Sequence, residues 1–105
     1  MKYEVVISEA AENDLRMIYE YIAISLLSPI NAAGQLSRIE KQIMSLDESP
    51  HKFPRYKREP WKSRGLRFVP VDNYLIFYIP DDDQAKVTVT RVMYGGRDIT
   101  EILNQ

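Results

Sequence analysis

Half of the positive charge of this 105-residue chain lies in residues 52–67, which we call the basic segment. It holds seven of the 14 lysine and arginine residues and a single acid, Glu59, whereas the whole chain has a formal net charge of -1. Three aromatic side chains lie among these cations: Phe53, Tyr56 and Trp61. Because cations contact phosphates and aromatic rings stack on bases, the segment predicts a nucleic-acid-binding surface. The alternative is a solvated loop whose aromatic side chains cover the core.

The composition excludes several kinds of site. The chain has no cysteine, which excludes thiolate metal ligands, disulfides and a cysteine nucleophile, and its single histidine, His51, excludes a zinc site built from histidines. We therefore expect no metal and no cofactor. The length fits one domain, residues 1–105. Since no apolar run reaches the length of a membrane span and the N-terminus turns acidic where a signal peptide would be apolar, we expect a cytoplasmic protein.

Apolar residues at helical spacing predict two amphipathic helices that follow a first strand at residues 2–7. Ser8 can cap the first helix, and Ser28 with Pro29 can begin the second. The apolar stripe of the first helix consists of Ala11, Leu15, Ile18, Ile22 and Leu26. That of the second consists of Leu36, Ile39, Ile43 and Leu46. The short turn between the helices makes them antiparallel neighbours, so we expect a helical hairpin.

The second half of the chain predicts three more strands. Residues 66–71 alternate in polarity, and Pro70 indicates that this strand ends there or lies at an edge. Residues 74–79 are continuously apolar and predict the centre of the sheet, whereas residues 86–94 alternate again and turn Val87, Val89 and Val92 inward. Asp98 can cap a short last helix with Ile99, Ile102 and Leu103. The order β-α-α-β-β-β predicts an α+β fold, a mostly antiparallel sheet with the helical hairpin on one face.

Five stretches of this chain stand in a specific order: AAENDLRMIYEYI, SPINAA, LDESP, GLRFVPVDNYLIFYI and RVMYGGRDITEIL. In their order and spacing they resemble the RelE/ParE superfamily of toxins from type II toxin–antitoxin systems. The resemblance spans nearly the whole chain. It implies a compact bacterial toxin that inhibits cell growth and is held inactive by an antitoxin from the same operon.

The superfamily has two branches with different targets, and the sequence resembles both. RelE-like members cut mRNA in the ribosomal decoding site, and the basic segment resembles their cationic surface. ParE-like members poison DNA gyrase without catalysis, and the long helical pair with SPINAA resembles theirs. We expect ribosome-dependent mRNA cleavage by a metal-independent endoribonuclease, with gyrase poisoning as the alternative. A third possibility is an inert member that only sequesters its antitoxin or represses its operon.

Metal-free RNA cleavage uses the neighbouring 2'-hydroxyl as nucleophile and needs a base, cations that stabilise the phosphorane and an acid. The resemblance assigns the contact to the scissile phosphate to Arg67, in GLRF, and a second catalytic arginine to Arg97, in GGRD. Tyr94 would stack on a base or act through its hydroxyl. The RNA-binding residues would be Lys52, Arg55, Lys57, Arg58, Lys62 and Arg64.

Two further residues near these cations could take part in proton transfer. Glu59 could act as the general base, although an ion pair with Arg58 or Lys62 is the interpretation we rank higher. His51 directly follows Pro50, and we expect it to be an exposed loop residue. We expect the antitoxin to place an amphipathic helix or strand over this cationic face, with an acidic stretch that neutralises it.

Overall fold

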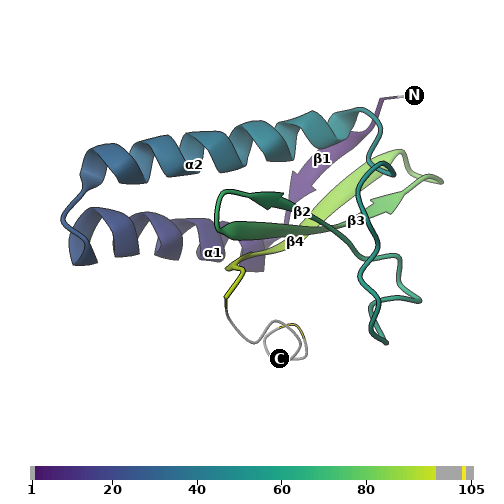
Figure 1. Ribbon diagram of the computed structural model, residues 1–105. Coiled ribbons are helices and arrows are strands. Elements are labelled where there is room, and N and C mark those ends of the chain that lie inside the picture. The colour runs from purple at the N-terminus through teal and green to yellow at the C-terminus, as the bar shows by residue number, and fades with distance from the viewer. Residues whose placement is uncertain (1, 97–102, 104–105) are drawn as a thin grey trace.

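The computed structural model describes residues 2–96 and Leu103, and it shows two helices beside a four-stranded sheet (Figure 1). The strands are β1 (Glu4–Ile7), β2 (Arg67–Val71), β3 (Tyr74–Asp81) and β4 (Lys86–Tyr94), in the sheet order β1-β4-β3-β2. The helices are α1 (Glu9–Glu20) and α2 (Pro29–Met44). β1 pairs with β4 in parallel, and the other two pairs are antiparallel. The predicted α+β fold is therefore confirmed, and β2 is the edge strand that Pro70 indicated.

The helical hairpin begins as predicted but turns differently. The Ser8 hydroxyl accepts a hydrogen bond from the Ala11 N–H at 3.1 Å and so caps α1. α1 continues into a wider π-helical turn, Tyr21–Ser25. This turn shifts the helical phase, so Leu26 is 55% exposed and does not belong to the buried stripe. Pro29 stands in the first turn of α2, but the Ser28 side chain makes no capping hydrogen bond, so that predicted cap is wrong.

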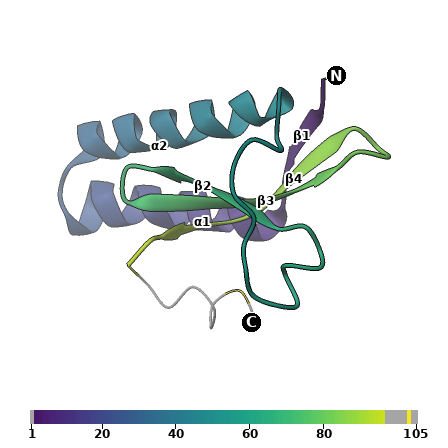
Figure 2. The same cartoon turned by 45° about the vertical axis from the view of Figure 1, so that its right-hand side comes forward.

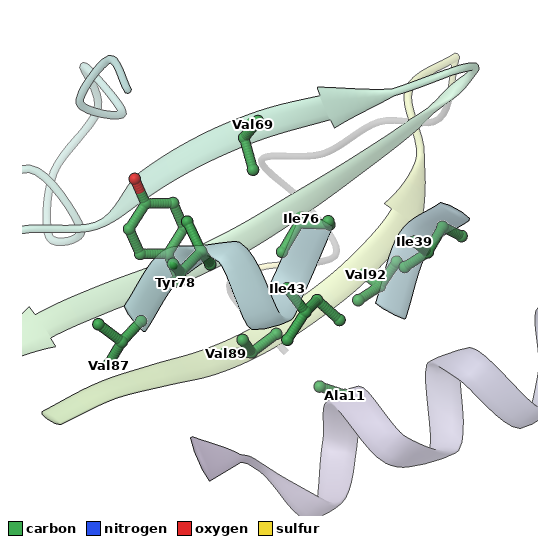
Figure 3. Packing of buried hydrophobic residues seen from close by; sticks show 10 residues of the cluster. Ala11, Ile39, Ile43, Val69, Ile76, Tyr78, Val87, Val89 and Val92 are labelled. Atoms are coloured by element: carbon green, nitrogen blue, oxygen red, sulfur yellow. The ribbon is translucent and has the colours of Figure 1, made fainter. Parts of the chain in front are cut away.

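The core lies between the hairpin and one face of the sheet (Figure 3). Apolar residues on the facing sides of the two helices meet every second residue of the strands there, which buries them from water. The cluster consists of Ala11, Ile39, Ile43, Leu46, Val69, Ile76, Tyr78, Val87, Val89 and Val92. The predicted inward orientation of the three β4 valines is confirmed.

A β-bulge in β4 explains how Val92 joins Val87 and Val89 although three residues separate it from Val89. Tyr78 of β3 pairs with Val89, but Phe77 pairs with Arg91, so Thr90 is the extra residue. The bulge changes which residues of β4 face the helices. The Thr90 hydroxyl donates a hydrogen bond to the Phe77 carbonyl at 3.2 Å, which fastens the bulge to β3.

The opposite face of the sheet carries a second, smaller cluster of buried residues. Leu66, Phe77, Met93 and Leu103 form its buried part, and Tyr56 and Trp61 of the basic segment pack against it. Phe53 is packed against the larger core. The aromatic rings of the basic segment are thus half-buried, and covering the core is the role the structure gives them.

The last part of the chain is described at one position. Leu103 is helical and buried, whereas Asp98, Ile99 and Ile102 of the predicted last helix lie outside the described residues. In residues 2–96, neither helix is long and apolar enough to cross a lipid bilayer.

Candidate nucleic-acid interface

The six cations that the sequence assigns to RNA binding are all exposed. In the described part of the chain, no carboxylate lies within 4.0 Å of their charged nitrogen atoms. Two of them lie over aromatic rings, the Lys52 ammonium 5.1 Å from the Phe53 ring centre and the Arg64 guanidinium 5.0 Å from that of Trp61. Cations over rings keep their charge, so the segment presents unneutralised positive charge to solvent.

The basic segment forms a loop that extends away from the sheet and returns to the start of β2 (Figure 2). Arg55 forms a β-bridge with Arg67, the Tyr56 N–H donates to the Leu66 carbonyl at 2.8 Å, and a turn closes the tip. Gly65 adopts a φ of 81° in this turn, a left-handed conformation that glycine takes without strain.

Glu59 is a partner of Ser63, and the predicted ion pair with Arg58 or Lys62 is wrong. Its carboxylate accepts hydrogen bonds from the Ser63 N–H at 2.8 Å and the Ser63 hydroxyl at 2.7 Å. These bonds lower the pKa of Glu59, and attraction to Lys62 adds to the effect. A carboxylate with a lowered pKa is a weaker proton acceptor, so Glu59 is poorly suited to act as a general base.

Arg67 has one edge of its guanidinium occupied and the other edge open. Its Nη1 donates to the His51 carbonyl at 3.0 Å and to the Phe53 carbonyl at 2.6 Å. Within the described residues, its Nε and Nη2 have no hydrogen-bond partner. These two nitrogens form the edge that binds a phosphate through two parallel hydrogen bonds.

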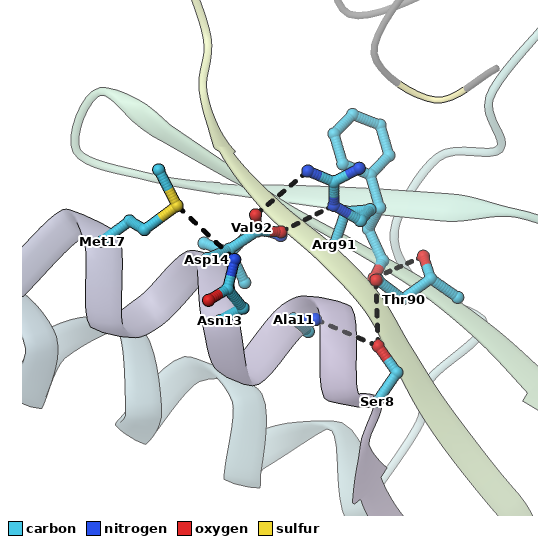
Figure 4. A network of polar contacts seen from close by, with 9 residues as sticks. Ser8, Ala11, Asn13, Asp14, Met17, Thr90, Arg91 and Val92 are labelled. Atoms are coloured by element: carbon cyan, nitrogen blue, oxygen red, sulfur yellow. Dashed lines mark hydrogen bonds and ion pairs between the residues drawn. The ribbon is translucent and has the colours of Figure 1, made fainter. Parts of the chain in front are cut away.

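Arg91 shows the same edge already in use (Figure 4). Its Nε and Nη2 donate to the two oxygens of Asp14 at 2.7 and 3.0 Å. The Val92 N–H donates to the same carboxylate at 3.0 Å. Asp14 thereby provides an acceptor for a backbone N–H in the part of β4 that extends beyond its pairing with β1. The hydrogen bond to Asp14 also raises the pKa of Arg91. Arg91 is neutralised by a direct ion pair within the fold. Arg67 donates its hydrogen bonds to uncharged carbonyls and attracts Asp82 only from a longer distance.

His51 belongs to a polar cluster next to Arg67. Its Nε2 lies 2.7 Å from Oδ1 of Asp82, and the Tyr3 hydroxyl donates to the same oxygen at 2.7 Å. The rings of Tyr3 and His51 meet edge to face, with centres 6.3 Å apart. The hydrogen bond with His51, followed by that from Tyr3, lowers the pKa of Asp82, and Asp82 in turn raises the pKa of Tyr3.

This cluster could not be found from sequence periodicity. Tyr3 and Asp82 are 79 residues apart, and Asp82 and His51 are 31 apart. The parallel pairing of β1 with β4 brings the start of the chain beside the acidic turn that begins at Asp82. His51 is exposed, as expected, but it is fixed on both its backbone and its ring.

Tyr94 lies at the other end of the sheet from Arg67. Arg67 pairs with Tyr78, whereas Tyr94 pairs with Tyr74 at the start of β3. These two positions of β3 are four residues apart, which is about 13 Å of extended chain. The Tyr74 and Tyr94 rings meet edge to face at 5.9 Å. The structure therefore does not bring Tyr94 to Arg67, and Arg97 lies outside the described residues.

Tyr94 instead lines a groove of about 1130 Å³ between the helical hairpin and the ends of β3 and β4. Its walls include Tyr21, Ile22, Leu26, Asn31, Tyr74 and Tyr94. Several apolar side chains at the adjoining hairpin tip are largely exposed, including Ile24, Leu27 and Ile30. This end of the molecule is apolar, whereas the end with Arg67 is cationic.

The sequence matches one known family, and the fold is similar to solved structures. The family described as "ParE toxin of type II toxin-antitoxin system, parDE" matches residues 5–99. None of the curated proteins matches the sequence. A solved structure of the chromosomal ParDE system from P. aeruginosa is similar with a TM-score of 0.74 and 17% identity, over 89% of this chain and 96% of that one.

Two structures from the other branch are similar as well. The toxin–antitoxin complex RelBE2 from Mycobacterium tuberculosis gives a TM-score of 0.65 and 20% identity, over 90% of this chain and 99% of that one. A mutant of the E. coli toxin RelE in the free state gives 0.68 and 16%, over 99% and 93%. At these identities the likeness shows a shared fold.

Proposed function

The chain belongs to the ParE toxin family of type II toxin–antitoxin systems, whose family model matches residues 5–99. From the geometry of Arg67 and the exposed cations of the basic segment, we propose that it stops growth by cutting mRNA on the ribosome. The open edge of the Arg67 guanidinium supports this proposal most directly. It is a fixed cation with no carboxylate within 4.0 Å among the described residues, although Asp82 is near enough to attract it, and it lies next to six exposed cations. Such an arrangement suits an RNA backbone with one phosphate held for reaction.

In the proposed reaction Arg67 binds the scissile phosphate through Nε and Nη2. Its charge stabilises the phosphorane, on which negative charge accumulates. The exposed cations of the basic segment hold flanking phosphates, and the ribosome aligns the mRNA. Tyr94 and Arg97 keep the roles that the sequence predicted for them only if the end of β4 comes close to the bound RNA.

We propose that the partner that silences this chain is a cognate antitoxin in the cytoplasm. Similar proteins were solved as toxin–antitoxin complexes. An acidic stretch of the antitoxin would neutralise the basic segment, because opposite charges attract strongly across such a surface.

Gyrase poisoning is the second candidate, and the apolar hairpin tip supports it. Ile24, Leu27 and Ile30 are 68%, 84% and 86% exposed, and they adjoin the groove. A poison needs a docking surface and no catalytic group, and an exposed apolar patch of this kind can supply one.

The deciding experiment is induction of wild type, Arg67→Ala and Arg67→Lys in cells, with pulse labelling of protein and DNA synthesis. We expect translation to stop first, with new transcript ends, and Arg67→Ala to lower the cleavage rate about 100-fold. Lysine can still reach a carbonyl but lacks the two-nitrogen edge, so Arg67→Lys should also be impaired.

Arg38→Ala is the matched control, since Arg38 lies in α2 and donates to Asp72 at 2.8 Å. It should stay as toxic as wild type. If DNA synthesis stops first and both Arg67 variants remain toxic, gyrase poisoning is the function. In that case Leu27→Asp, at the hairpin tip, should remove toxicity.

A further inference from the structure

The cluster around His51 supplies what the proposed cleavage still lacks, a ring nitrogen that can accept the proton of the 2'-hydroxyl. Glu59 is bound to Ser63, and Tyr94 lies at the far end of the sheet. We propose that His51 is the general base of RNA cleavage and that Asp82 and Tyr3 position its ring. This inference rests on the proposed function and adds to it the residue that activates the nucleophile.

The hydrogen bonds of Asp82 determine which nitrogen of His51 can act. An ionised carboxylate can only accept hydrogen bonds, so the Nε2 that lies 2.7 Å from Asp82 carries the proton. A neutral imidazole then has its lone pair on Nδ1, which is the proton acceptor. The lowered pKa of Asp82 keeps the carboxylate ionised throughout the range in which histidine titrates. A carboxylate that orients a histidine base is a recurring arrangement in hydrolytic sites.

The same residue links the base to the proposed phosphate site. Arg67 Nη1 donates to the His51 carbonyl at 3.0 Å, so the guanidinium and the imidazole are fixed to one residue. In the described part of the chain, the charged or titratable groups that contact or adjoin His51 are Asp82, Tyr3, Arg67 and Lys52. Arg67 also attracts Asp82, the carboxylate that holds the His51 ring, so the guanidinium and the ring lie in the same part of the surface. The proposal requires that a phosphate on the open edge of Arg67 brings the 2'-hydroxyl to Nδ1 of His51, with Lys52 available for a neighbouring phosphate.

The proposed step exchanges one phosphorus–oxygen bond for another and needs no reactant besides water. Nδ1 of His51 takes the proton of the 2'-hydroxyl, and the 2'-oxygen forms a bond to the adjacent phosphorus. The bond from phosphorus to the 5'-oxygen then breaks, and that oxygen takes a proton from water. The products are a 2',3'-cyclic phosphate and a 5'-hydroxyl, and the imidazolium returns its proton to solvent.

The test is a single-turnover cleavage assay with mRNA-programmed ribosomes and the purified toxin, from about pH 5.5 to 8.5. For wild type the rate should rise with pH and then level off, because a general base acts only in its unprotonated form. His51→Gln should lower the rate about 100- to 10,000-fold and abolish this rise, with RNA affinity unchanged. Glu59→Gln is the matched control in the same surface and should cleave like wild type.

Asp82 is tested as a positioning residue. Asp82→Ala should lower the rate at least tenfold, and Asp82→Glu should restore most of it, because a glutamate can again accept the Nε2 proton. Thermal unfolding of each variant verifies that it is folded, and His51→Asn provides a second substitution at the base.

Three outcomes would overturn the inference. If His51→Gln and His51→Asn cleave within about threefold of wild type, histidine is not the base. If Asp82→Ala cleaves like wild type, the positioning role is wrong. If the wild-type toxin does not cleave mRNA and arrests DNA synthesis, the proposed function fails, and the inference fails with it.

Discussion

Tyr78 fastens the start of the basic segment to the core. Its side chain is fully buried, and its hydroxyl donates a hydrogen bond to the Pro50 carbonyl at 2.7 Å. Burial raises the pKa of Tyr78 to about 12, partly offset by attraction to Arg67. The folded protein favours the neutral phenol of Tyr78, so its contribution to stability is complete below about pH 10, the pKa of tyrosine in the unfolded chain. It is lost as pH rises from there to about 12.

Tyr78→Phe should therefore lower the free energy of unfolding by about 1 to 2 kcal/mol at pH 7, because the Pro50 carbonyl loses its donor. It should also reduce the loss of stability between pH 10 and 12. Urea denaturation at pH 7, 10 and 11 measures both effects. Tyr19→Phe, at an exposed position of α1, should match wild type at every pH. Equal pH slopes for Tyr78→Phe and wild type would contradict the assignment.

The two arginines at the sheet show why the site could be predicted only in part. Arg67 was identified from its place in GLRF, and the structure leaves its phosphate-binding edge open. Arg91 also lies in a strand, but its acid, Asp14, is 77 residues away in α1. A contact between residues so far apart in sequence depends on the order of the strands in the sheet, and a local sequence pattern does not reveal that order. The same reason hid the contact between His51 and Asp82.

The connection between the helices contains the least favourable backbone conformation of the hairpin. Leu27 has a φ of 53° and is 84% exposed. A leucine in the left-handed region costs about 1 kcal/mol or more, and this one buries little surface in return. Strain at an exposed apolar residue is consistent with a surface retained for contact with a partner.

Leu27→Gly should increase the free energy of unfolding by about 1 kcal/mol, since glycine adopts this conformation without strain. Chemical denaturation would measure the change. Leu26→Gly is the neighbouring control, because Leu26 has a φ of -95° and is also exposed. That variant should be neutral or destabilised. If both variants are destabilised equally, the strain at Leu27 is not relieved by glycine.

At the level of elements, the pattern of polar and apolar residues was sufficient for the strands and helices but not for their irregularities. The stripe of the first helix was predicted to include Leu26, and the π-helical turn removes it. The three inward valines of β4 were predicted correctly, and their uneven spacing is explained by the bulge at Thr90. Irregular turns depend on hydrogen bonds with distant strands, so local periodicity does not contain them.

At the scale of the whole molecule, one end is apolar and the other is cationic, and we expect the cationic end to bind RNA. The six exposed cations of the basic segment lack ion-pair partners in the described part of the chain. RNA affinity should therefore fall steeply as salt rises, by a slope of about -0.7 in logarithmic units for each phosphate contact. Fluorescence anisotropy with a labelled single-stranded RNA at several salt concentrations measures this slope.

The double variant Lys57→Gln with Arg58→Gln should reduce the magnitude of the slope by about 1.4, because two phosphate contacts are lost. Lys41→Gln, in α2 and outside the basic segment, should leave it unchanged. An affinity that does not depend on salt would argue against phosphate contact by these residues.

The parallel pairing of β1 with β4 also determines when this protein can become active during its synthesis. Glu4–Ile7 pairs with residues 86–89, so the first strand is synthesised about 80 residues before its partner. Contacts this distant in sequence form late, because closing so long a loop is costly until both ends are present. A nascent chain that has not reached β4 therefore lacks the central strand that joins β1 to β3, and so lacks the pairing that brings Tyr3 beside Asp82. Prematurely terminated products should be harmless substrates for proteases, and the ribosome that makes the toxin completes it before the toxin can act.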